Sequence, residues 1–362
     1  MSRRQEVVSL PLPPHLRNRL LEAGFTHTGD LERAGGALGL AKEVGITPAE
    51  AHDVLQLLGL GAGTGRGAAG PAGPGAGAAG WGTGAVSAAE LLAEAEARPP
   101  VVTLCRELDG LLGGGVAVGG VTEFCGEPGV GKTQLGLQLS VSAQLPAALN
   151  GPQGQVVYVD TEGSFMVERC VDIAEGAVRH VRALAEAQAA QGRPQLADAL
   201  RSGAVPYDVE GLLRGIHYFR IHDVTEQLAL VTSLPRFLQL YPQVRLVVFD
   251  SITFHFRQDM SDMAQRTRLV TAMAQQLISA AQTYGVAVVL MNQVTTKFLE
   301  GGGTKMVPAL GESWGHAAST RVMLYWGQDH ERHAALFKSP CLPPGDVAYA
   351  VTTDGIRSLR RR

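Results

Sequence analysis

The stretch of sequence that decides the fold runs from residue 126 to residue 133 and reads Gly126-Glu127-Pro128-Gly129-Val130-Gly131-Lys132-Thr133. It matches the pattern G-x-x-x-x-G-K-[ST] and lies between an apolar run ending at Cys125 and a helical run beginning at Gln134. In that setting backbone N–H groups surround phosphates, Lys132 reaches the β and γ oxygens, and the Thr133 hydroxyl can coordinate Mg²⁺. The stretch therefore predicts a P-loop that binds ATP with Mg²⁺, and its eight residues together with Gln134 are the candidate nucleotide-binding residues.

Apolar runs on both sides of this loop alternate with helical patterns. Five short runs have the composition of buried strands, and they cover residues 121–125, 155–160, 217–221, 245–250 and 286–291. Helical stretches separate most of them, which predicts an α/β fold with a mainly parallel, twisted sheet flanked by helices. Because such sheets bind ligands at the carboxyl ends of their strands, we expect the functional residues directly after these runs.

Two carboxylates follow predicted strands. Glu162 comes just after the 155–160 run, where it could polarise a water molecule in line with the γ-phosphate or could instead cap the following helix. The pattern alone leaves these two interpretations open. Asp250 ends the 245–250 run in the position of a Walker B carboxylate, which would hold a water of the Mg²⁺ shell beside Thr133. A strand ending in Asp is a weak signal by itself, but together with a P-loop it indicates a magnesium site.

Amides and cations follow the last two predicted strands. Asn292 and Gln293 end the 286–291 run, where they could sense the γ-phosphate or could simply close a strand. Segments 253–268 and 294–311 are polar and carry cations beside aromatic residues, a composition suited to single-stranded nucleic acid on mobile loops. A solvated loop remains the alternative, because acidic residues dilute the charge. The candidate DNA-binding residues are Arg257, Arg266, Lys297 and Lys305.

The start of the chain has a different pattern. Residues 1–60 carry apolar residues at helical spacing, which predicts a small all-α domain, and Thr47-Pro48-Ala49-Glu50 has the form of a capping box that begins a helix. Residues 61–84 are almost entirely Gly, Ala, Pro and Thr, so we expect a flexible linker over 61–88. Its Trp81 is either incidental or an interface anchor. The ATPase core is expected over 89–362.

Composition excludes several classes of protein. The 362 residues are 45% hydrophobic and 18% charged, so the chain can bury a core and is not disordered throughout. A net charge of −3 excludes a histone-like chain coated with basic residues, so a polyanion would have to meet a local patch. We expect no membrane span and no secretory signal. The 4 cysteines form no C-x-x-C pair, which favours a reducing compartment, the cytosol or the nucleus.

The motifs taken together resemble the ATPase core of the RecA-family strand-exchange recombinases. Besides the P-loop, the resemblance rests on Asp160-Thr161-Glu162-Gly163-Ser164-Phe165, Asn292-Gln293-Val294 and Gly315-His316-Ala317. The helical start followed by a tether is similar to the eukaryotic and archaeal branch of that family. The amino-acid sequence at residues 162–169, 255–257 and 307–316 resembles that of the C-type paralogues of the eukaryotic recombinase. The likeness covers nearly the whole chain except the linker.

The resemblance implies roles that the residues alone leave open. It implies a RecA-like core in which Lys132 and Glu162 are catalytic, Gln293 is the γ-phosphate switch, and Arg169 contacts the adenine side. The resemblance also implies that the two polar segments, 253–268 and 294–311, are DNA-binding loops. The implied protein is a nuclear, possibly also cytoplasmic, DNA-dependent ATPase that acts in homologous recombination at double-strand breaks and stalled forks. Its implied partners are single-stranded and branched DNA, other paralogues and the main recombinase, in hetero-oligomers.

The sequence departs from the family in two places. The linker has no Phe-x-x-Ala plug of the kind that self-polymerising members carry, and Trp81 is the only candidate substitute. The acidic residue before the Ser-Pro of the ATP cap is Lys338 here, so a neighbour's nucleotide would meet a cation. Two other functions therefore remain open: an ATP-binding scaffold with little or no catalysis, and a helicase-type motor.

Overall fold

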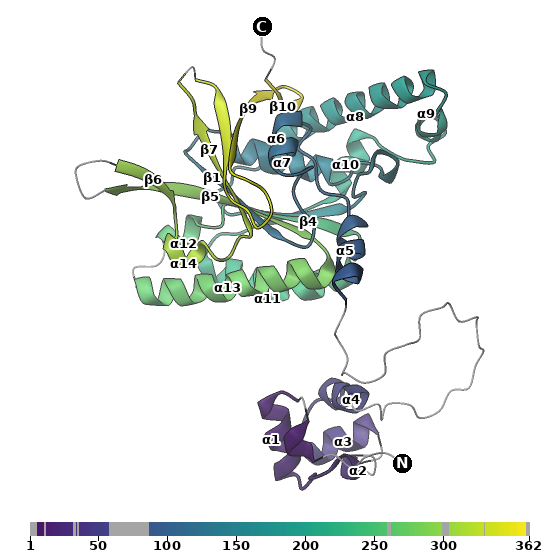
Figure 1. The fold of residues 1–362 in the computed structure, drawn as a ribbon, viewed down its shortest axis with the longest axis vertical. Helices are drawn as coiled ribbons and strands as arrows, with labels where there is room; N and C mark the ends of the chain where they lie inside the picture. Colours follow the sequence, from purple (N-terminus) through teal and green to yellow (C-terminus); the bar gives the residue numbers. More distant parts are fainter. Residues whose placement is uncertain are drawn as a thin grey trace. The chain divides into compact units, whose positions relative to one another are not determined.

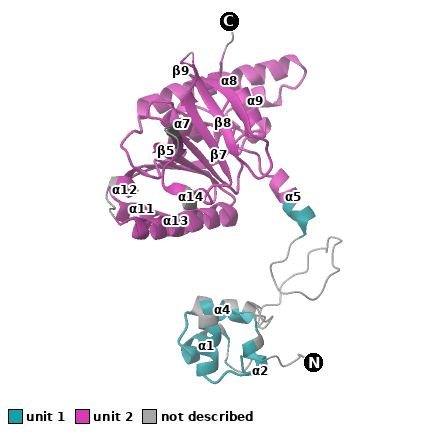
Figure 2. Cartoon of the chain, turned by 60° about the vertical axis from the view of Figure 1, so that its left-hand side comes forward, with its two compact units in different colours: residues 1–91 teal, residues 92–362 magenta. Residues whose placement is uncertain are grey.

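The computed structural model describes residues 6–10, 12–31, 34, 36–57, 87–258, 262–298, 304–328 and 330–359. The chain splits into two compact units, residues 1–91 and residues 92–362, coloured separately in Figure 2. Most of the predicted linker, with Trp81, and the last three arginines lie outside the described residues. The two units are described separately.

The first unit is helical, as the apolar spacing predicts. It contains the short 3-10 turn η1 (Val7–Ser9) and the helices α1 (Pro14–Glu22), α2 (Thr28–Leu31), α3 (Ala37–Val44) and α4 (Pro48–Leu57). Their apolar faces form one buried cluster that includes Leu16, Leu20, Leu40 and Val54.

The predicted capping box at the start of α4 is confirmed. The backbone N–H of Thr47 donates to Glu50 Oε2 at 2.8 Å, and the backbone N–H of Glu50 donates to Thr47 Oγ1 at 3.2 Å. This reciprocal pair satisfies two N–H groups that the first turn of a helix would otherwise leave without partners.

The second unit is built around one ten-stranded sheet (Figure 1). Its strands are β1 (Val121–Gly126), β2 (Gln155–Asp160), β3 (Ile216–Arg220), β4 (Val244–Asp250), β5 (Ala287–Phe298), β6 (Thr304–Pro308), β7 (Thr320–Trp326), β8 (Arg332–Lys338), β9 (Gly345–Thr352) and β10 (Gly355–Ser358). The order is β10-β9-β8-β7-β1-β5-β4-β2-β3, with β6 paired to β5. All neighbours from β7 to β3 are parallel, while β7 to β10 are antiparallel. The predicted α/β class with a mostly parallel sheet is confirmed.

Helices cover both faces of this sheet, as Figure 1 shows. Helix α5 (Ala88–Glu96) spans the boundary between the two units at residues 91 and 92. The other helical elements of the second unit are α6 (Arg106–Leu111), α7 (Lys132–Ser142), η2 (Ala147–Leu149), α8 (Val167–Ala190), α9 (Gln195–Arg201), α10 (Val209–Arg214), α11 (Val224–Leu240), α12 (Phe254–Gln258), α13 (Met263–Tyr284) and α14 (Gly311–Trp314). One buried cluster packs α7 and α8 on one face, and a second packs α11 and α13 on the other.

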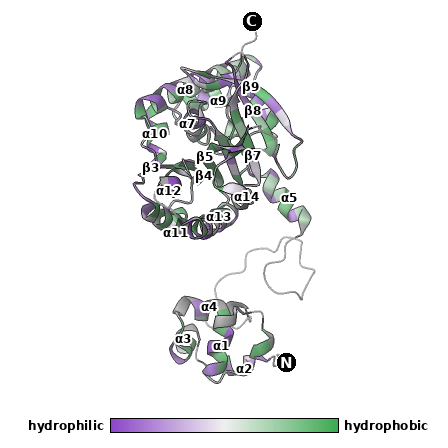
Figure 3. Ribbon diagram, turned by 90° about the vertical axis from the view of Figure 1, so that its left-hand side faces the viewer, coloured by the Kyte–Doolittle hydropathy of each residue, from purple (hydrophilic) through white to green (hydrophobic). Residues whose placement is uncertain are grey.

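The central strands are buried on both faces because helices cover both. Every residue of β1 is buried, and β4 is buried except at Arg245. Figure 3 shows hydrophobic colour along β4 and β5 and mixed colours on α11 and α13, whose outer faces meet water. Since parallel strands run the same way, the ends of β1, β2, β4 and β5 meet at one edge of the sheet, and this edge carries the site.

The structure corrects the expectation that segments 253–268 and 294–311 are loops. The first holds α12 and the start of α13, and the Asp262 side chain caps α13 by accepting from the N–H groups of Ala264 and Gln265. Strand β5 does not end at Met291 but continues to Phe298 and pairs with β6 as an antiparallel hairpin. Strand β1 pairs with β5 as far as Gln293, and from Val294 onward the partner of β5 is β6.

The four strands after residue 319 were not among the predicted strands. Their alternating pattern is weaker than the apolar runs of the parallel strands, because only one residue in two of β7 and β8 points into the core. Among the described residues, no helix is both long and apolar enough to span a bilayer.

Candidate functional site

The P-loop joins the end of β1 to the first turn of α7. Gly129 and Gly131 have φ values of +79° and +110°, which non-glycine residues rarely adopt. At Gly126 a Cβ would lie 2.4 Å from the carbonyl oxygen of Leu324 on the neighbouring strand, so only glycine fits. These glycines turn the backbone N–H groups toward the space in front of α7, as anion binding at a helix N-terminus requires.

The ammonium group of Lys132 lies within this loop. Its Nζ donates to the carbonyl oxygens of Gly126 at 2.8 Å and Glu127 at 2.9 Å. Burial lowers the pKa of Lys132, and the nearby carboxylates of Asp250 and Glu162 act in the opposite direction. A half-buried cation beside backbone N–H groups gains most from a polyanionic ligand, and phosphates would supply that charge.

Val130 has a different role from the other residues of the loop. Its side chain is fully buried in the core, and its carbonyl oxygen accepts a hydrogen bond from the Tyr349 hydroxyl at 2.9 Å. The cavity in front of α7, of about 380 Å³, is lined by Pro128, Gly129, Gly131, Lys132, Thr133, Gln134, Glu162, Asp250 and Gln293. The lining does not include Gly126, Glu127 or Val130, which thus contribute to the shape of the loop.

Asp250 ends β4 beside Thr133, as a magnesium site requires. Its carboxylate accepts from the Tyr158 hydroxyl at 2.9 Å, and the Thr133 side chain lies nearby. Burial raises the pKa of Asp250, and the side chains of Thr133 and Tyr158 act in the opposite direction by favouring the ionised form.

The donor set suits Mg²⁺ that is brought in by a nucleotide. In the described parts of the chain no group of three or more His, Cys, Asp and Glu side chains could hold a metal by themselves. Mg²⁺ is usually held by one or two protein oxygens together with substrate phosphates and waters. Thr133 and Asp250 fit that pattern.

Glu162 lies on a loop that Asp160 organises. Asp160 Oδ1 accepts from the backbone N–H groups of Glu162, Gly163 and Ser164 at 3.1, 2.7 and 3.1 Å. Its Oδ2 accepts from the Phe165 N–H at 3.2 Å. Our sequence analysis did not assign a function to Asp160, although four consecutive N–H groups depend on this one buried carboxylate.

The Glu162 carboxylate is a shared acceptor. Its Oε1 accepts from the Ser251 hydroxyl at 2.5 Å and from the Gln293 side-chain amide at 2.9 Å. These bonds bring together the loop after β2, the residue after β4 and strand β5. Glu162 is therefore held in the cavity facing the P-loop, and the N-cap residue of the following helix, α8, makes no side-chain capping hydrogen bond. Ser251 was missed from the sequence, although it directly follows Asp250.

Arg169 lies on α8, next to the P-loop helix. Its Nε donates to Gln134 Oε1 at 2.7 Å, and its two Nη atoms donate to the backbone carbonyls of Thr353 and Thr352 at 2.5 Å each. Arg169 thereby ties the first turn of α7 to the turn between β9 and β10. The contact on the adenine side that the resemblance implies for Arg169 stays a prediction.

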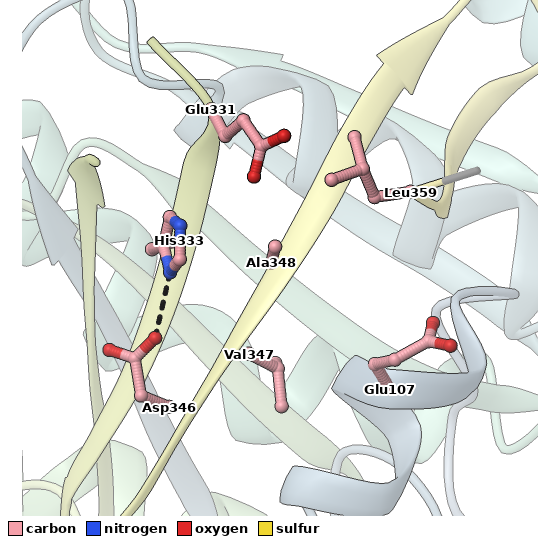
Figure 4. Close-up of a pocket in the computed structure, with 7 residues that line it drawn as sticks. All are labelled: Glu107, Glu331, His333, Asp346, Val347, Ala348 and Leu359. Carbon is pink, nitrogen blue, oxygen red and sulfur yellow. Dashed lines mark hydrogen bonds and ion pairs between the residues drawn. The ribbon is translucent and has the colours of Figure 1, made fainter. Parts of the chain in front are cut away.

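A second cavity, of about 450 Å³, lies over β8 and β9 (Figure 4). Its walls carry the carboxylates of Glu107, Glu331 and Asp346, and His333 Nδ1 is 2.8 Å from Asp346 Oδ1. Three carboxylates would repel a triphosphate, whereas the cavity at the P-loop presents an ammonium and backbone N–H groups. Charge therefore favours the P-loop cavity over this one as a site for a nucleotide, although the two cavities are similar in volume.

The candidate DNA-binding cations lie on four different elements, α12, α13, β5 and β6. Arg257 is on α12 and donates to Gln293 Oε1 at 2.5 Å, and Arg266 is on the first turns of α13. Lys297 and Lys305 are cross-strand partners in the β5–β6 hairpin. The Lys305 side chain is not among the side chains that the structure describes.

Lys338 lies at the end of β8, and its ammonium group is engaged within its own chain. Nζ donates to the carbonyls of Gly315 and Ala318 at 2.6 and 2.7 Å. Burial, with the nearby Arg321 guanidinium, lowers the pKa of Lys338. Within its own chain, Lys338 thus stabilises the 315–318 turn.

The fold and the site together define a P-loop nucleotide-binding protein with a RecA-like core. The family description Rad51 matches residues 99–190 and 197–359. The chain therefore belongs to the Rad51 family. It is similar to the DNA repair protein RAD51 homolog 3 of Cricetulus griseus, with 40% identity over 98% of this chain and 92% of the relative. It is also similar to RAD51 homolog 3 of Dictyostelium discoideum, with 38% identity over 76% of this chain and 70% of the relative.

Proposed function

We propose that this chain is a Mg²⁺-dependent ATPase of the C-type paralogue group that binds DNA and acts in homologous-recombination repair. The name RAD51 homolog 3, which both relatives carry, supports the assignment to this group. The observation that carries the ATPase proposal is that Lys132, Thr133, Asp250, Glu162 and Gln293 all line one cavity.

Each residue has a part in the proposed reaction. Lys132 and the loop N–H groups bind the β- and γ-phosphates, and Thr133 and Asp250 hold Mg²⁺, which supplies charge neutralisation when it is bound. Glu162 accepts a proton from the attacking water. Gln293, which donates to Glu162 at 2.9 Å, reports whether a γ-phosphate is present.

The proposed assembly is a nuclear hetero-oligomer of paralogues that assists the main recombinase at single-stranded and branched DNA. The helix α12, the start of α13 and the β5–β6 hairpin follow strands that end at the nucleotide cavity, so they are the proposed DNA surface. Arg257, Arg266, Lys297 and Lys305 supply its positive charge.

The experiment that tests this proposal is ATP turnover by the purified chain, alone and with paralogue partners, with and without Mg²⁺ and single-stranded DNA. We expect Mg²⁺-dependent turnover that DNA stimulates, and a folded Lys132→Ala variant should lose ATP binding or turnover because it lacks the cation facing the phosphates. Mg²⁺-ATP binding without turnover under every condition would instead indicate the scaffold, and unwinding of duplex DNA by the chain alone would indicate the motor.

A further inference from the structure

A continuous set of hydrogen bonds connects α12 to the carboxylate of Glu162. Arg257 Nη1 donates to Gln293 Oε1 at 2.5 Å, and Gln293 Nε2 donates to Glu162 Oε1 at 2.9 Å. The Ser251 hydroxyl donates to the same Glu162 oxygen at 2.5 Å. The Arg257 side chain therefore bonds a residue of the nucleotide cavity, although it comes from a segment expected to face DNA.

The chemistry of the three groups determines which way the Gln293 amide faces. A guanidinium can only donate hydrogen bonds, and an ionised carboxylate can only accept them. The amide has a carbonyl oxygen on one side and an NH₂ group on the other, so it fits between Arg257 and Glu162 in one orientation. The reversed amide would place its NH₂ group against the guanidinium and its oxygen against the carboxylate, and both contacts would be repulsive.

We infer that Arg257 is a positioning residue for ATP hydrolysis, because it holds the Gln293 carbonyl and so directs the Gln293 NH₂ group to Glu162. This inference rests on the proposed ATPase function. It separates Arg257 from Arg266, Lys297 and Lys305, for which only a DNA contact is proposed. Without Arg257 the amide can rotate, and the Glu162 carboxylate loses a fixed donor that helps hold it in place.

The variants that test this role are Arg257→Met, which keeps the length of the side chain without its donors, and Arg257→Lys, which keeps a charge and a donor. Arg236→Met is the matched control, because Arg236 is an exposed arginine on α11 outside the nucleotide cavity. Each is made in the wild-type chain and in a Gln293→Ala chain. ATP affinity and turnover are measured without DNA and then with single-stranded DNA.

We expect Arg257→Met to keep ATP affinity within about 2-fold and to lower turnover without DNA by roughly 10-fold or more, as expected for a misplaced catalytic group. Arg257→Lys should recover part of this loss. In the Gln293→Ala chain the same substitution should have no further effect, because residues that act as a unit are not additive. Unchanged turnover without DNA, or an equal loss in the Gln293→Ala chain, would overturn the inference.

A second measurement does not depend on turnover. The side-chain ¹H–¹⁵N amide resonance of Gln293, assigned by its disappearance in Gln293→Ala, should move in Arg257→Met and stay in place in Arg236→Met. An unmoved resonance would overturn the contact itself. A chain that shows the shift but hydrolyses no ATP, alone or with partners, would support the Arg257–Gln293 contact and overturn the proposed ATPase, so the two failures are distinguishable.

Discussion

At the scale of single residues, the site depends on carboxylates that have similar positions in the sequence but different surroundings. Asp160 is the last residue of β2 and Glu162 comes two residues later, yet Asp160 is fully buried and bonds four backbone N–H groups, whereas Glu162 is exposed to the cavity. The buried carboxylate shapes the loop, and the exposed one is available to a water molecule. This difference in surroundings supports Glu162 as the base.

Glu162→Gln should leave ATP binding intact and lower turnover by ~100-fold or more, which is the range for losing a general base. Glutamine keeps the size of the side chain and can still accept from Ser251 and Gln293, but it cannot take a proton from water. ATP affinity and steady-state phosphate release are the measurements, with the exposed Glu168→Gln as the control. Turnover at the wild-type rate would show that Glu162 is only structural.

Asp250→Asn should keep or raise the stability of the folded chain while weakening its binding of Mg²⁺. Burial raises the pKa of Asp250, so between its ordinary pKa and the raised one the folded chain holds a proton that the unfolded chain has released. The free energy of unfolding therefore falls as the pH rises through that interval, and Asp250→Asn should remove this fall. At neutral pH and without nucleotide, we expect its Tm to equal or exceed that of the wild type.

The measurement is Tm against pH, with and without Mg²⁺-ATP, with the exposed Asp198→Asn as the control. Mg²⁺-ATP should raise the Tm of the wild type and the control by mass action but should raise that of Asp250→Asn much less. An equal rise in all three proteins would exclude Asp250 from the magnesium site.

At the scale of elements, strand β5 links the two proposed activities. Its residues 287–291 lie in the centre of the sheet between β1 and β4, Gln293 faces the nucleotide cavity, and its last residues pair with β6. A change at Gln293 can therefore reach Lys297 along one continuous strand. The same strand would place a nucleotide and a DNA phosphate on a single rigid element.

Lys297→Ser should weaken binding of single-stranded DNA to a similar degree for any sequence, since phosphate contacts carry no base information. The slope of log affinity against log salt should become shallower by about 0.7, the counterion contribution of one phosphate on a single strand. A fluorescence-anisotropy salt titration with and without a non-hydrolysable ATP analogue measures both, and the exposed Arg214→Gln on α10 is the control. Identical slopes for Lys297→Ser and wild type would place the DNA surface elsewhere.

At the scale of the whole molecule, the two units have separate hydrophobic cores. The helical unit is packed around residues such as Leu20 and Leu40, and the larger unit around the two faces of its sheet. Ligand binding stabilises only the unit that contains the site. We therefore expect Mg²⁺-ATP to protect the larger unit selectively.

Leu20→Ala should destabilise the helical unit by about 3 kcal/mol, the usual cost of truncating a buried leucine, because Leu20 is fully buried. ATP affinity should stay within about 2-fold. Hydrogen exchange of the full chain measures both units at once: α1 to α4 should exchange faster while β1 and β4 keep their protection. Equal loss of protection in both units would contradict separate unfolding.

The sequence by itself determined the class of fold, the P-loop, the strand ending at Asp250 and the helix start at Thr47. Each of these depends on residues that are close together in the chain. The glycine spacing, the apolar runs and the reciprocal cap act over a few residues, so their patterns survive in the linear sequence.

Only the tertiary structure decided which side chains of the site touch one another. Asp160 bonds the loop that carries Glu162, Arg257 bonds Gln293 across 36 residues, and Lys338 braces a turn of its own chain. The four later strands and the hairpin also depended on pairing with strands far away in the chain. Hydrogen-bond partners depend on where the folded backbone brings donors and acceptors together. Charge and composition along the sequence do not show which distant residues will lie close enough to bond.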